Sequence, residues 1–369
     1  RSRRPAGRPA RPVSPRAACA YQADYGAQRF RRSRPWHNRV VTDTSAPSAL
    51  APPIRPTGSR PLGGADDRDE AALGRVERLA SLLEKADAVA VGAGAGLSVA
   101  DGDAHAGPAF EERFADFIAR YGFTDAYTAG FHPFASPEEK WAYWSRHISL
   151  LRYETGPGAV YADLLALLSG RDFFVLTTNV DHRFQRAGFP KDRLFYTQGD
   201  YGLLQCSGPC HDATYDNEGT IRAMVERQRD MRVPTGLVPH CPRCGEPMST
   251  NLRVDATFVQ DAGWHTAADR CARWLRAHGD GRVLYLELGV GTSTPAIIRH
   301  PFWQRTYLNE RAAYAGISLD PVAPREIAER SVLIDADLAP VLARLACRGA
   351  TSTGPQTSGR PSGTRSRGR

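Results

Sequence analysis

The clearest chemical signal in the sequence is a set of four cysteines in two closely spaced pairs: Cys206, Cys210, Cys241 and Cys244. Two such pairs match the spacing of a structural zinc site, in which four thiolates complete a tetrahedral shell. Because no position is left for a water ligand, the pattern argues against a zinc-bound nucleophile. Disulfides and free thiols are the alternatives, and the neighbouring His211 and His240 are alternative ligands.

A glycine-rich segment, Gly-Ala-Gly-Ala-Gly at 92–96, directly follows the apolar run 88–91. Residues without Cβ let backbone amides approach a pyrophosphate, and the N-terminus of a following helix favours negative charge. The spacing departs from the strict dinucleotide fingerprint, so a tight strand-to-helix turn without a ligand is the alternative. We expect Ser98 to cap this helix or to contact a phosphate.

Three more polar clusters follow apolar runs, at 177–181 (Thr-Thr-Asn-Val-Asp), at 197–199 (Thr-Gln-Gly) and at 289–293 (Gly-Val-Gly-Thr-Ser). In open α/β sheets, ligands bind at the carboxyl ends of the strands. The four clusters therefore predict a phosphate- and ribose-binding mouth at one edge of a sheet.

The elements that must position these clusters follow from apolar patterning. Short apolar runs predict buried strands at 88–91, 173–176, 194–196, 283–288, 313–317 and 332–334. Apolar residues at helical spacing predict helices at 70–86, 110–121, 137–151 and 159–168, with the aromatic stripes of the second and third packed in the core. This alternation predicts an α/β fold, a Rossmann-like parallel sheet with helices on both faces plus a small zinc-ribbon module at about 200–255.

The charge of the 369 residues is concentrated at the two ends. Residues 1–68 contain 14 arginines and 4 acidic residues, and 347–369 contain 5 arginines and no acid, so 69–346 carries −7 although the chain is +8. The two ends are predicted to be a disordered basic leader and tail. Anionic contacts or targeting are the alternatives for the leader. The acidic middle disfavours specific nucleic-acid binding.

Two further exclusions come from composition. No run approaches 18 consecutive apolar residues, which excludes a helical membrane span from the prediction. Three cysteines lack partners at useful spacing, namely Cys19, Cys271 and Cys347. Unpaired thiols beside a thiolate metal site indicate a reducing compartment, and hence a cytoplasmic location.

The order of these motifs resembles the sirtuin family over residues 70–340. Gly-Ala-Gly-Leu-Ser at 94–98 is followed by Thr-Asn-Val-Asp-His at 178–182, Tyr-Thr-Gln-Gly-Asp-Tyr-Gly at 196–202, the four cysteines and Gly-Thr-Ser at 291–293. The second and third motifs are similar to those of the macrodomain-linked, class M sirtuins.

The resemblance implies that NAD, as co-substrate, lies between a Rossmann-type domain and the zinc module. It implies that 94–98 holds the pyrophosphate, that 291–293 meets the adenosine ribose, and that Asn179 and Asp181 lie near the nicotinamide ribose. The cofactor-binding residues so expected are Gly94, Ala95, Gly96, Ser98, Thr178, Gly291, Thr292, Ser293 and Asn309. The expected catalytic residues are Asn179, Asp181, Gln198 and Arg253.

The departures from the family pattern bear on the reaction. Gln198 stands where sirtuin deacylases have a histidine base, and an amide cannot accept a proton near neutral pH. The segment 99–103 replaces the usual Gly-Ile-Pro-Asp-Phe-Arg, and Thr178 replaces a glutamine. For Asp181, Gln198 and Arg253 the alternatives are a helix cap, a turn amide without a ligand and a surface ion pair.

An NAD constellation without the deacylase base predicts a protein mono-ADP-ribosyltransferase. The rival hypotheses are an NAD-dependent deacylase that uses another base, with His182 nearest, and a non-catalytic NAD or ADP-ribose sensor. The class M resemblance implies an acceptor protein, namely a lipoylated, glycine-cleavage H-like carrier, and a macrodomain hydrolase as functional partner.

Overall fold

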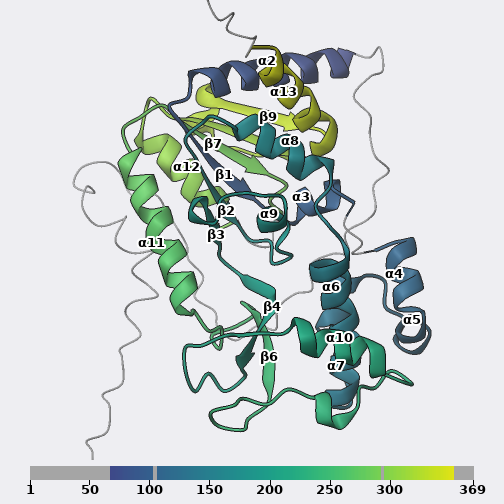
Figure 1. The fold of residues 1–369 in the computed structure, drawn as a ribbon. Coiled ribbons are helices and arrows are strands. Elements are labelled where there is room, and N and C mark those ends of the chain that lie inside the picture. Colours follow the sequence, from purple (N-terminus) through teal and green to yellow (C-terminus); the bar gives the residue numbers. More distant parts are fainter. Residues whose placement is uncertain (1–66, 103–105, 292–294, 353–369) are drawn as a thin grey trace, which may run out of the picture. The chain divides into compact units, whose positions relative to one another are not determined.

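The computed structural model describes residues 67–102, 106–291 and 295–352 (Figure 1). The predicted leader therefore lies almost wholly outside the described residues. The predicted tail begins at 347, whereas the last helix, α13 (Leu338–Ser352), continues past that boundary. No described helix is long and apolar enough to cross a membrane.

A six-stranded, wholly parallel sheet forms the larger part of the fold, in the order β3-β2-β1-β7-β8-β9. Its strands are β1 (Ala88–Ala93), β2 (Phe173–Thr177), β3 (Leu194–Tyr196), β7 (Val283–Leu288), β8 (Ala313–Ser318) and β9 (Ser331–Asp335). Every residue of β1, β2 and β7 is buried, as expected for strands that are covered on both faces. All six predicted strands are confirmed.

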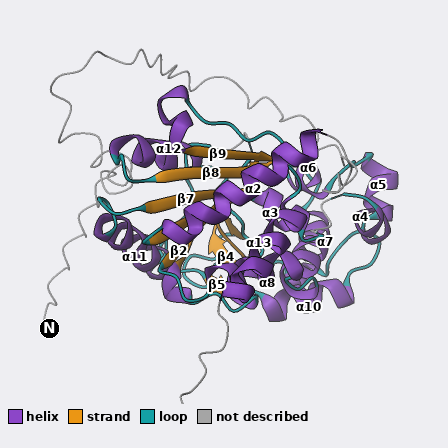
Figure 2. Ribbon diagram, turned by 90° about the horizontal axis from the view of Figure 1, so that it is seen from above, coloured by secondary structure: helices purple, strands orange, loops and turns teal. Residues whose placement is uncertain are grey.

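Helices cover both faces of this sheet, which confirms the predicted fold class (Figure 2). Alternate residues of β1 enter different cores, since Val89 and Val91 share one with α2, α8 and α13, while Ala88 and Ala90 share another with α11 and α12. The helices around the sheet are α2 (Asp67–Lys85), α3 (Ala95–Ala100), α8 (Ala159–Leu168), α9 (Arg183–Arg186), α11 (Ala262–Ala277), α12 (Arg299–Leu308) and α13.

The predicted zinc-ribbon module is a second, antiparallel sheet of order β5-β4-β6. Its strands are β4 (Gly199–Cys206), β5 (Tyr215–Asp216) and β6 (Met248–Leu252). Helices from two separate chain segments share its core: α4 (Pro108–Arg113), α5 (Ala115–Tyr121), α6 (Ala126–Gly130), α7 (Pro137–Ile148) and α10 (Glu218–Arg227). The module is therefore larger than the range predicted from the cysteines.

Two of the predicted helices have different bounds in the structure. The stretch 110–121 is two short helices that meet at Phe114, and 137–151 is α7 followed by a π-helical segment, Ser149–Glu154. Their aromatic stripes are core, as expected, because Phe110, Phe117 and Trp141 are all buried. Three 3₁₀ segments, Lys191–Arg193, Thr235–Leu237 and Arg325–Arg330, complete the described elements.

Candidate active site and metal centre

The site lies where the strand order of the large sheet reverses direction. From β1 the chain passes to β2 and β3 on one side, and β7, β8 and β9 lie on the other. The loops that leave β1 and β7 therefore diverge, and such a switch point is where doubly wound sheets bind ligands. The clusters predicted at 92–96 and 289–293 are these two loops.

The glycines of the first loop allow it to pack backbone against backbone on the second loop. A Cβ on Gly94 would lie 2.7 Å from the Gly289 oxygen, and one on Gly96 would lie 2.7 Å from the Gly289 Cα. The amides of Gly94 and Gly96 donate to the carbonyls of Leu288 (3.0 Å) and Gly289 (2.9 Å). The expectation that the loop's amides are directed at a pyrophosphate is thus corrected for these two amides, which bind the neighbouring loop.

Substitution of Gly96 by alanine tests this contact. Because the obstructing atoms are backbone, we expect Gly96→Ala to lower the free energy of unfolding by about 1–3 kcal/mol. The matched control is Gly74→Ala in α2, where no atom lies within 4 Å of the new Cβ and a gain of about 0.5–1 kcal/mol is expected. Urea denaturation of both variants measures the change in the free energy of unfolding. Equal changes for the two variants would contradict the packing role of Gly96.

A buried hydrogen-bond network joins this loop to the end of β2. The Ser98 hydroxyl donates to Asp181 Oδ2 (2.5 Å), accepts from Asn179 Nδ2 (3.1 Å) and lies 2.8 Å from the Tyr161 hydroxyl. Ser98, Asn179 and Asp181 are 1%, 9% and 5% exposed. Burial, with the nearby charge of Asp181, raises the pKa of Tyr161 well above its usual value, so Tyr161 is the neutral donor to Ser98.

The Ser98 hydroxyl is thus engaged by three neighbouring side chains. Ser98 is the fourth residue of α3 rather than its cap, since the N-cap is Gly94. The predicted cap role is therefore wrong, whereas the predicted phosphate contact stays a prediction. The Ser98 hydroxyl holds the amide of Asn179 and the carboxylate of Asp181 in fixed orientations.

The segment that departs from the sirtuin pattern also has a structural role. The Asp101 carboxylate accepts hydrogen bonds from the backbone amides of Gly158 (2.6 Å) and Val160 (3.1 Å) at the start of α8. Its Oδ2 lies 3.3 Å from an amino group of the fully buried Arg183. Asp101 thus fixes the end of α3 to α8 and α9, beside the Ser98 network.

Gln198 and Arg253 are brought together by the small sheet. They flank the β4–β6 ladder at the end where Gly199 pairs with Leu252, and the Arg253 amide donates to the Gln198 carbonyl (3.0 Å). Gly199 has φ +97°, and a Cβ there would lie 1.9 Å from the Asn251 carbonyl oxygen. The ladder therefore requires glycine directly after Gln198.

Two aromatic rings flank the Arg253 guanidinium. Among the described residues, no carboxylate forms an ion pair with it. Its centre lies 4.8 Å from the Phe258 ring and 5.5 Å from that of Trp264, whose Nε1 donates to the Thr197 carbonyl (3.2 Å). Burial lowers the pKa of Arg253, but a guanidinium remains charged at any physiological pH. This arrangement leaves its five donors available to an anion, which a surface ion pair would not.

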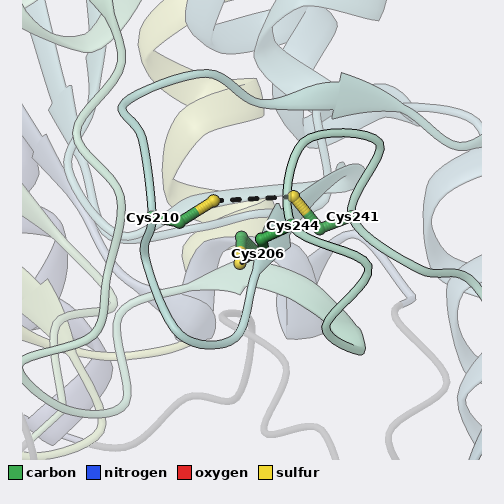
Figure 3. A group of neighbouring side chains, drawn as sticks. All are labelled: Cys206, Cys210, Cys241 and Cys244. Carbon is green, nitrogen blue, oxygen red and sulfur yellow. Dashed lines mark hydrogen bonds between the residues drawn. The ribbon is translucent and has the colours of Figure 1, made fainter.

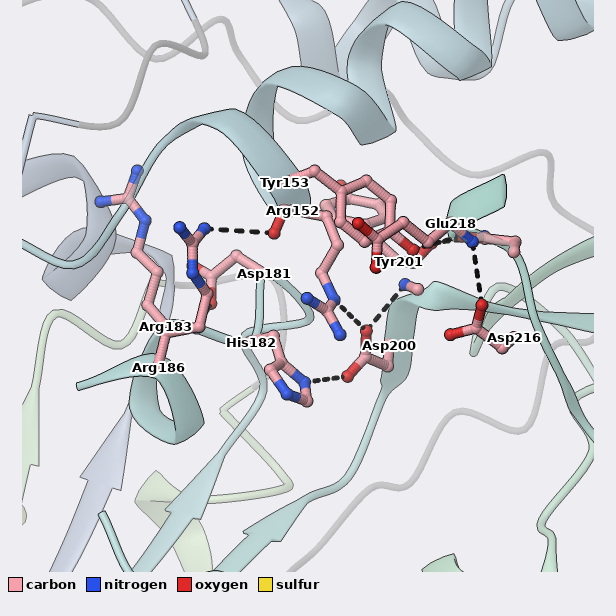
Figure 4. A network of polar contacts seen from close by, with 12 residues as sticks. Arg152, Tyr153, Asp181, His182, Arg183, Arg186, Asp200, Tyr201, Asp216 and Glu218 are labelled. Carbon is pink, nitrogen blue, oxygen red and sulfur yellow. Dashed lines mark hydrogen bonds and ion pairs between the residues drawn. The ribbon is translucent and has the colours of Figure 1, made fainter. Parts of the chain in front are cut away.

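A histidine of the loop after β2 pairs with a second carboxylate, which lies on β4 (Figure 4). His182 Nδ1 is 2.5 Å from Asp200 Oδ2, and Asp200 Oδ1 accepts from Arg152 Nε (2.9 Å) and the Gly202 amide (2.7 Å). Burial opposes ionisation of Asp200, but the hydrogen bond and charge of His182, the charge of Arg152 and the Gly202 amide together lower its pKa. Asp200 is therefore a buried, ionised carboxylate.

The four paired cysteines come together at the other end of the β4–β6 ladder (Figure 3). The Cys206 and Cys244 sulfurs are 3.6 Å apart, and those of Cys210 and Cys241 are 3.7 Å apart. Sulfurs bound to one zinc at about 2.3 Å lie about 3.8 Å from each other, whereas a disulfide is about 2.05 Å long. The cluster fits a tetrahedral zinc ion, and the disulfide alternative is wrong for these four residues.

His211 supports the cluster and does not replace a cysteine in it. Its Nδ1 lies 3.0 Å from Cys210 Sγ, and its Nε2 lies 2.8 Å from the Tyr215 hydroxyl. Imidazoles of this kind orient metal-bound thiolates by hydrogen bonding. His240 instead pairs with the Val238 carbonyl.

The structure places the other predicted residues unevenly. Thr178 lies at the mouth, where its amide donates to the Ala93 carbonyl (3.0 Å), and Gly291 is exposed after β7. Thr292 and Ser293 lie outside the described residues. Asn309 is wrong as a cofactor ligand, because its side chain binds the Gly281 carbonyl and the Arg311 amide at the amino ends of β7 and β8, the edge opposite the mouth.

Several residues that shape the site were missed from the sequence. Glu287 of β7 and Arg299 of α12 form a buried ion pair (2.7 Å), and Arg299 also holds the Val290 carbonyl (2.6 Å) of the loop that carries Gly291. Arg152 and Tyr161 also reach the site from segments that showed no chemical motif. Only Asp200 had a signal, because it directly follows Gln198 and glycine in a polar cluster.

A doubly wound parallel sheet with a four-cysteine module inserted before its central strand β7 is the architecture of a sirtuin-type protein. The chain is 38% identical over 270 residues to a protein ADP-ribosyltransferase of Staphylococcus aureus, covering 73% of this chain and 86% of that protein. The chain therefore belongs to the sirtuin-type family of protein ADP-ribosyltransferases.

Two further similarities were found. The chain is 34% identical over 234 residues to a probable bifunctional ADP-ribose hydrolase/ADP-ribosyltransferase of Fusarium oxysporum f. sp. cubense, covering 59% of this chain and 38% of that protein. Among solved structures, a Sir2 homologue in complex with NAD is 16% identical, with a TM-score of 0.47 over 75% of this chain and 94% of that one. No protein-family model matches the chain.

Proposed function

We propose that this protein transfers a single ADP-ribosyl group from NAD to an acceptor protein and releases nicotinamide. The observation that carries the proposal is Gln198, an amide beside Arg253 at the mouth of the sheet, where the sirtuin resemblance implies a histidine base. An amide can orient a hydroxyl but cannot take up its proton. Membership of a family of protein ADP-ribosyltransferases supports the same reaction.

The residues at the switch point fit NAD in two respects. The close backbone contact between the loops after β1 and β7 fixes the two strand ends at the switch point, which is where doubly wound sheets bind dinucleotides. The Ser98 hydroxyl also holds the Asn179 amide and the Asp181 carboxylate in fixed orientations. When bound, NAD would supply the ADP-ribosyl group and nicotinamide as the leaving group.

Each of the four proposed catalytic residues then has a definite task. Asn179 hydrogen-bonds ribose hydroxyls, and the buried carboxylate of Asp181 stabilises the positive charge that develops at the ribose. Gln198 orients a ribose or acceptor hydroxyl. Arg253, stacked on Phe258 and Trp264, clamps a phosphate or an acceptor carboxylate with two parallel hydrogen bonds.

The test uses NAD labelled on its adenosine side, with the full chain and candidate acceptor proteins. We expect label on an acceptor and an equal amount of free nicotinamide, with little hydrolysis of acyl-lysine peptides. Strong deacylation without label transfer would support the deacylase alternative, and NAD bound but left intact would support the sensor. Gln198→His is the matched variant, which should gain deacylation only if the wild-type residue is what prevents it.

We further propose a lipoylated, glycine-cleavage H-like carrier as the acceptor, a macrodomain hydrolase as functional partner and a cytoplasmic location. The class M resemblance supports the first two, and the relative whose name joins a hydrolase to a transferase supports the second. The described cysteines form no disulfide, which is consistent with a reducing compartment. Label transfer to lipoylated but not unlipoylated carrier, and its removal by a macrodomain hydrolase, would support the assignment.

A further inference from the structure

The His182–Asp200 pair is the feature of the mouth to which the proposed function gives no task. Its two residues come from the loops that carry the proposed catalytic groups, since His182 follows Asp181 and Asp200 lies two residues after Gln198. The Tyr201 amide donates to the Val180 carbonyl (2.9 Å) and joins these two loops. The imidazole therefore belongs to the same pair of joined loops as Asn179, Asp181 and Gln198.

The backbone at His182 is unusual. Its φ of 65° and ψ of 15° place it in the left-handed region, which residues other than glycine adopt uncommonly and which asparagine, aspartate and histidine adopt more often than the rest. Such conformations persist where the surrounding structure enforces them, and they cluster at functional sites. Here the conformation turns the imidazole toward β4, where Asp200 holds it.

The hydrogen bonds fix the form of the ring. Asp200 is ionised and accepts three donors, so Nδ1 of His182 carries the proton that it shares with Asp200. Nε2 lies on the side away from Asp200 and is the nitrogen that accepts a proton when the ring is neutral (Figure 4). The side chain of His182 is 27% exposed, whereas that of Asp200 is 6% exposed, so the ring and not the carboxylate is accessible.

The same arrangement orients the base in many hydrolases, where a buried carboxylate sets the tautomer of an imidazole. The charged groups nearest the ring are Asp200 of β4, which it contacts, and Arg152 of the π-helical segment, which pairs with Asp200. Asp181 and Arg183 are its neighbours in the chain.

We infer that His182 is the general base that deprotonates the acceptor in ADP-ribose transfer, with Asp200 as its positioning residue. This inference rests on the proposed function and names the acceptor chemistry, a protic nucleophile such as a hydroxyl, thiol or amine. The acceptor heteroatom bonds to the ribose carbon that bears nicotinamide, and the carbon–nitrogen bond breaks with its electron pair going to the nicotinamide nitrogen. The acceptor's proton passes to His182 Nε2 and then to solvent.

His182→Asn is the decisive variant, because asparagine tolerates the left-handed backbone but cannot accept a proton. We expect label transfer to fall by about 10²–10⁴-fold, with NAD affinity and thermal midpoint close to wild type. Asp200→Asn should lower kcat for label transfer and leave the KM for NAD close to wild type, because the imidazole loses the carboxylate that orients it.

His278→Gln is the matched control, since His278 also pairs with an aspartate, Asp172 (3.0 Å), but at the opposite edge of the sheet. It should transfer label at the wild-type rate. A His182→Asn variant that transfers label within about 5-fold of wild type, or that loses NAD binding in parallel, overturns the inference but leaves the proposed function intact. A wild-type protein that transfers no label overturns both.

Discussion

Asp181→Asn is expected to lower the rate of ADP-ribose transfer by about 10³-fold while NAD affinity changes little. The substitution keeps the shape of the side chain and one acceptor oxygen, which retains the hydrogen bond from the Arg183 amide, while an amide nitrogen replaces Oδ2 beside the Ser98 hydroxyl. What disappears is a negative charge that is 5% exposed. A charge so shielded from water acts far more strongly on the reacting ribose than an exposed one.

Single-turnover transfer at saturating NAD, with calorimetric titration of NAD binding, measures the two quantities separately. Asp269→Asn in α11 is the control, because it removes an exposed charge outside the mouth. Equal losses of rate and affinity would show that Asp181 binds the substrate and does not stabilise the reacting ribose.

Removal of zinc is the second change with a large expected effect. Cys244→Ser should reduce bound zinc to near zero and lower the rate of ADP-ribose transfer on the order of 100-fold or more. The reason is that the free energy of metal binding stabilises the folded module, and the loss of a few kcal/mol of it leaves most of the module unfolded. The cause is geometric. The cysteines fix one end of the β4–β6 ladder, where Cys206 pairs with Met248, and Gln198 and Arg253 flank the other end.

The module and the six-stranded sheet have separate cores, so the wild type should unfold in two transitions and the variant should retain only that of the sheet. Metal analysis, calorimetry and the transfer assay on one preparation check this. Cys347→Ser, an exposed thiol of α13, is the control and should retain zinc and activity. A zinc-free variant with wild-type transfer would show that the ladder keeps its register without the metal.

The sequence was sufficient for the large sheet because each of its strands is an apolar run buried on both faces, and such runs stand out without any tertiary information. The small sheet was recognisable only through its cysteines. β4 begins Gly-Asp-Tyr-Gly, which has no strand periodicity, and an irregular register between Asp200 and Leu204 interrupts its pairing. Helices α4–α7 were not assigned to the module because their partners lie about 100 residues further along the chain.

The site, like the fold, was predictable only in part. Motif order located the segments of Asn179, Asp181 and Gln198, whereas it could not specify which hydroxyl holds which carboxylate. Ser98 binds partners 63 and 83 residues away, and those contacts exist only in the folded chain. Asn309 was assigned from order alone, and it lies at the wrong edge because order does not tell which end of a strand a turn adjoins.

The pairing of β1 with β7 joins residues 195 positions apart, Ala88 with Val283. A ribosome adds about 5–20 residues per second, so β7 is synthesised roughly 10–40 s after β1. One edge of β1 stays unpaired until then. During that interval β1 presents unpaired amides and carbonyls between apolar side chains, which is the template on which other extended chains assemble. Production of this protein at lower temperature or with abundant chaperones should therefore increase the soluble yield more than stronger transcription does.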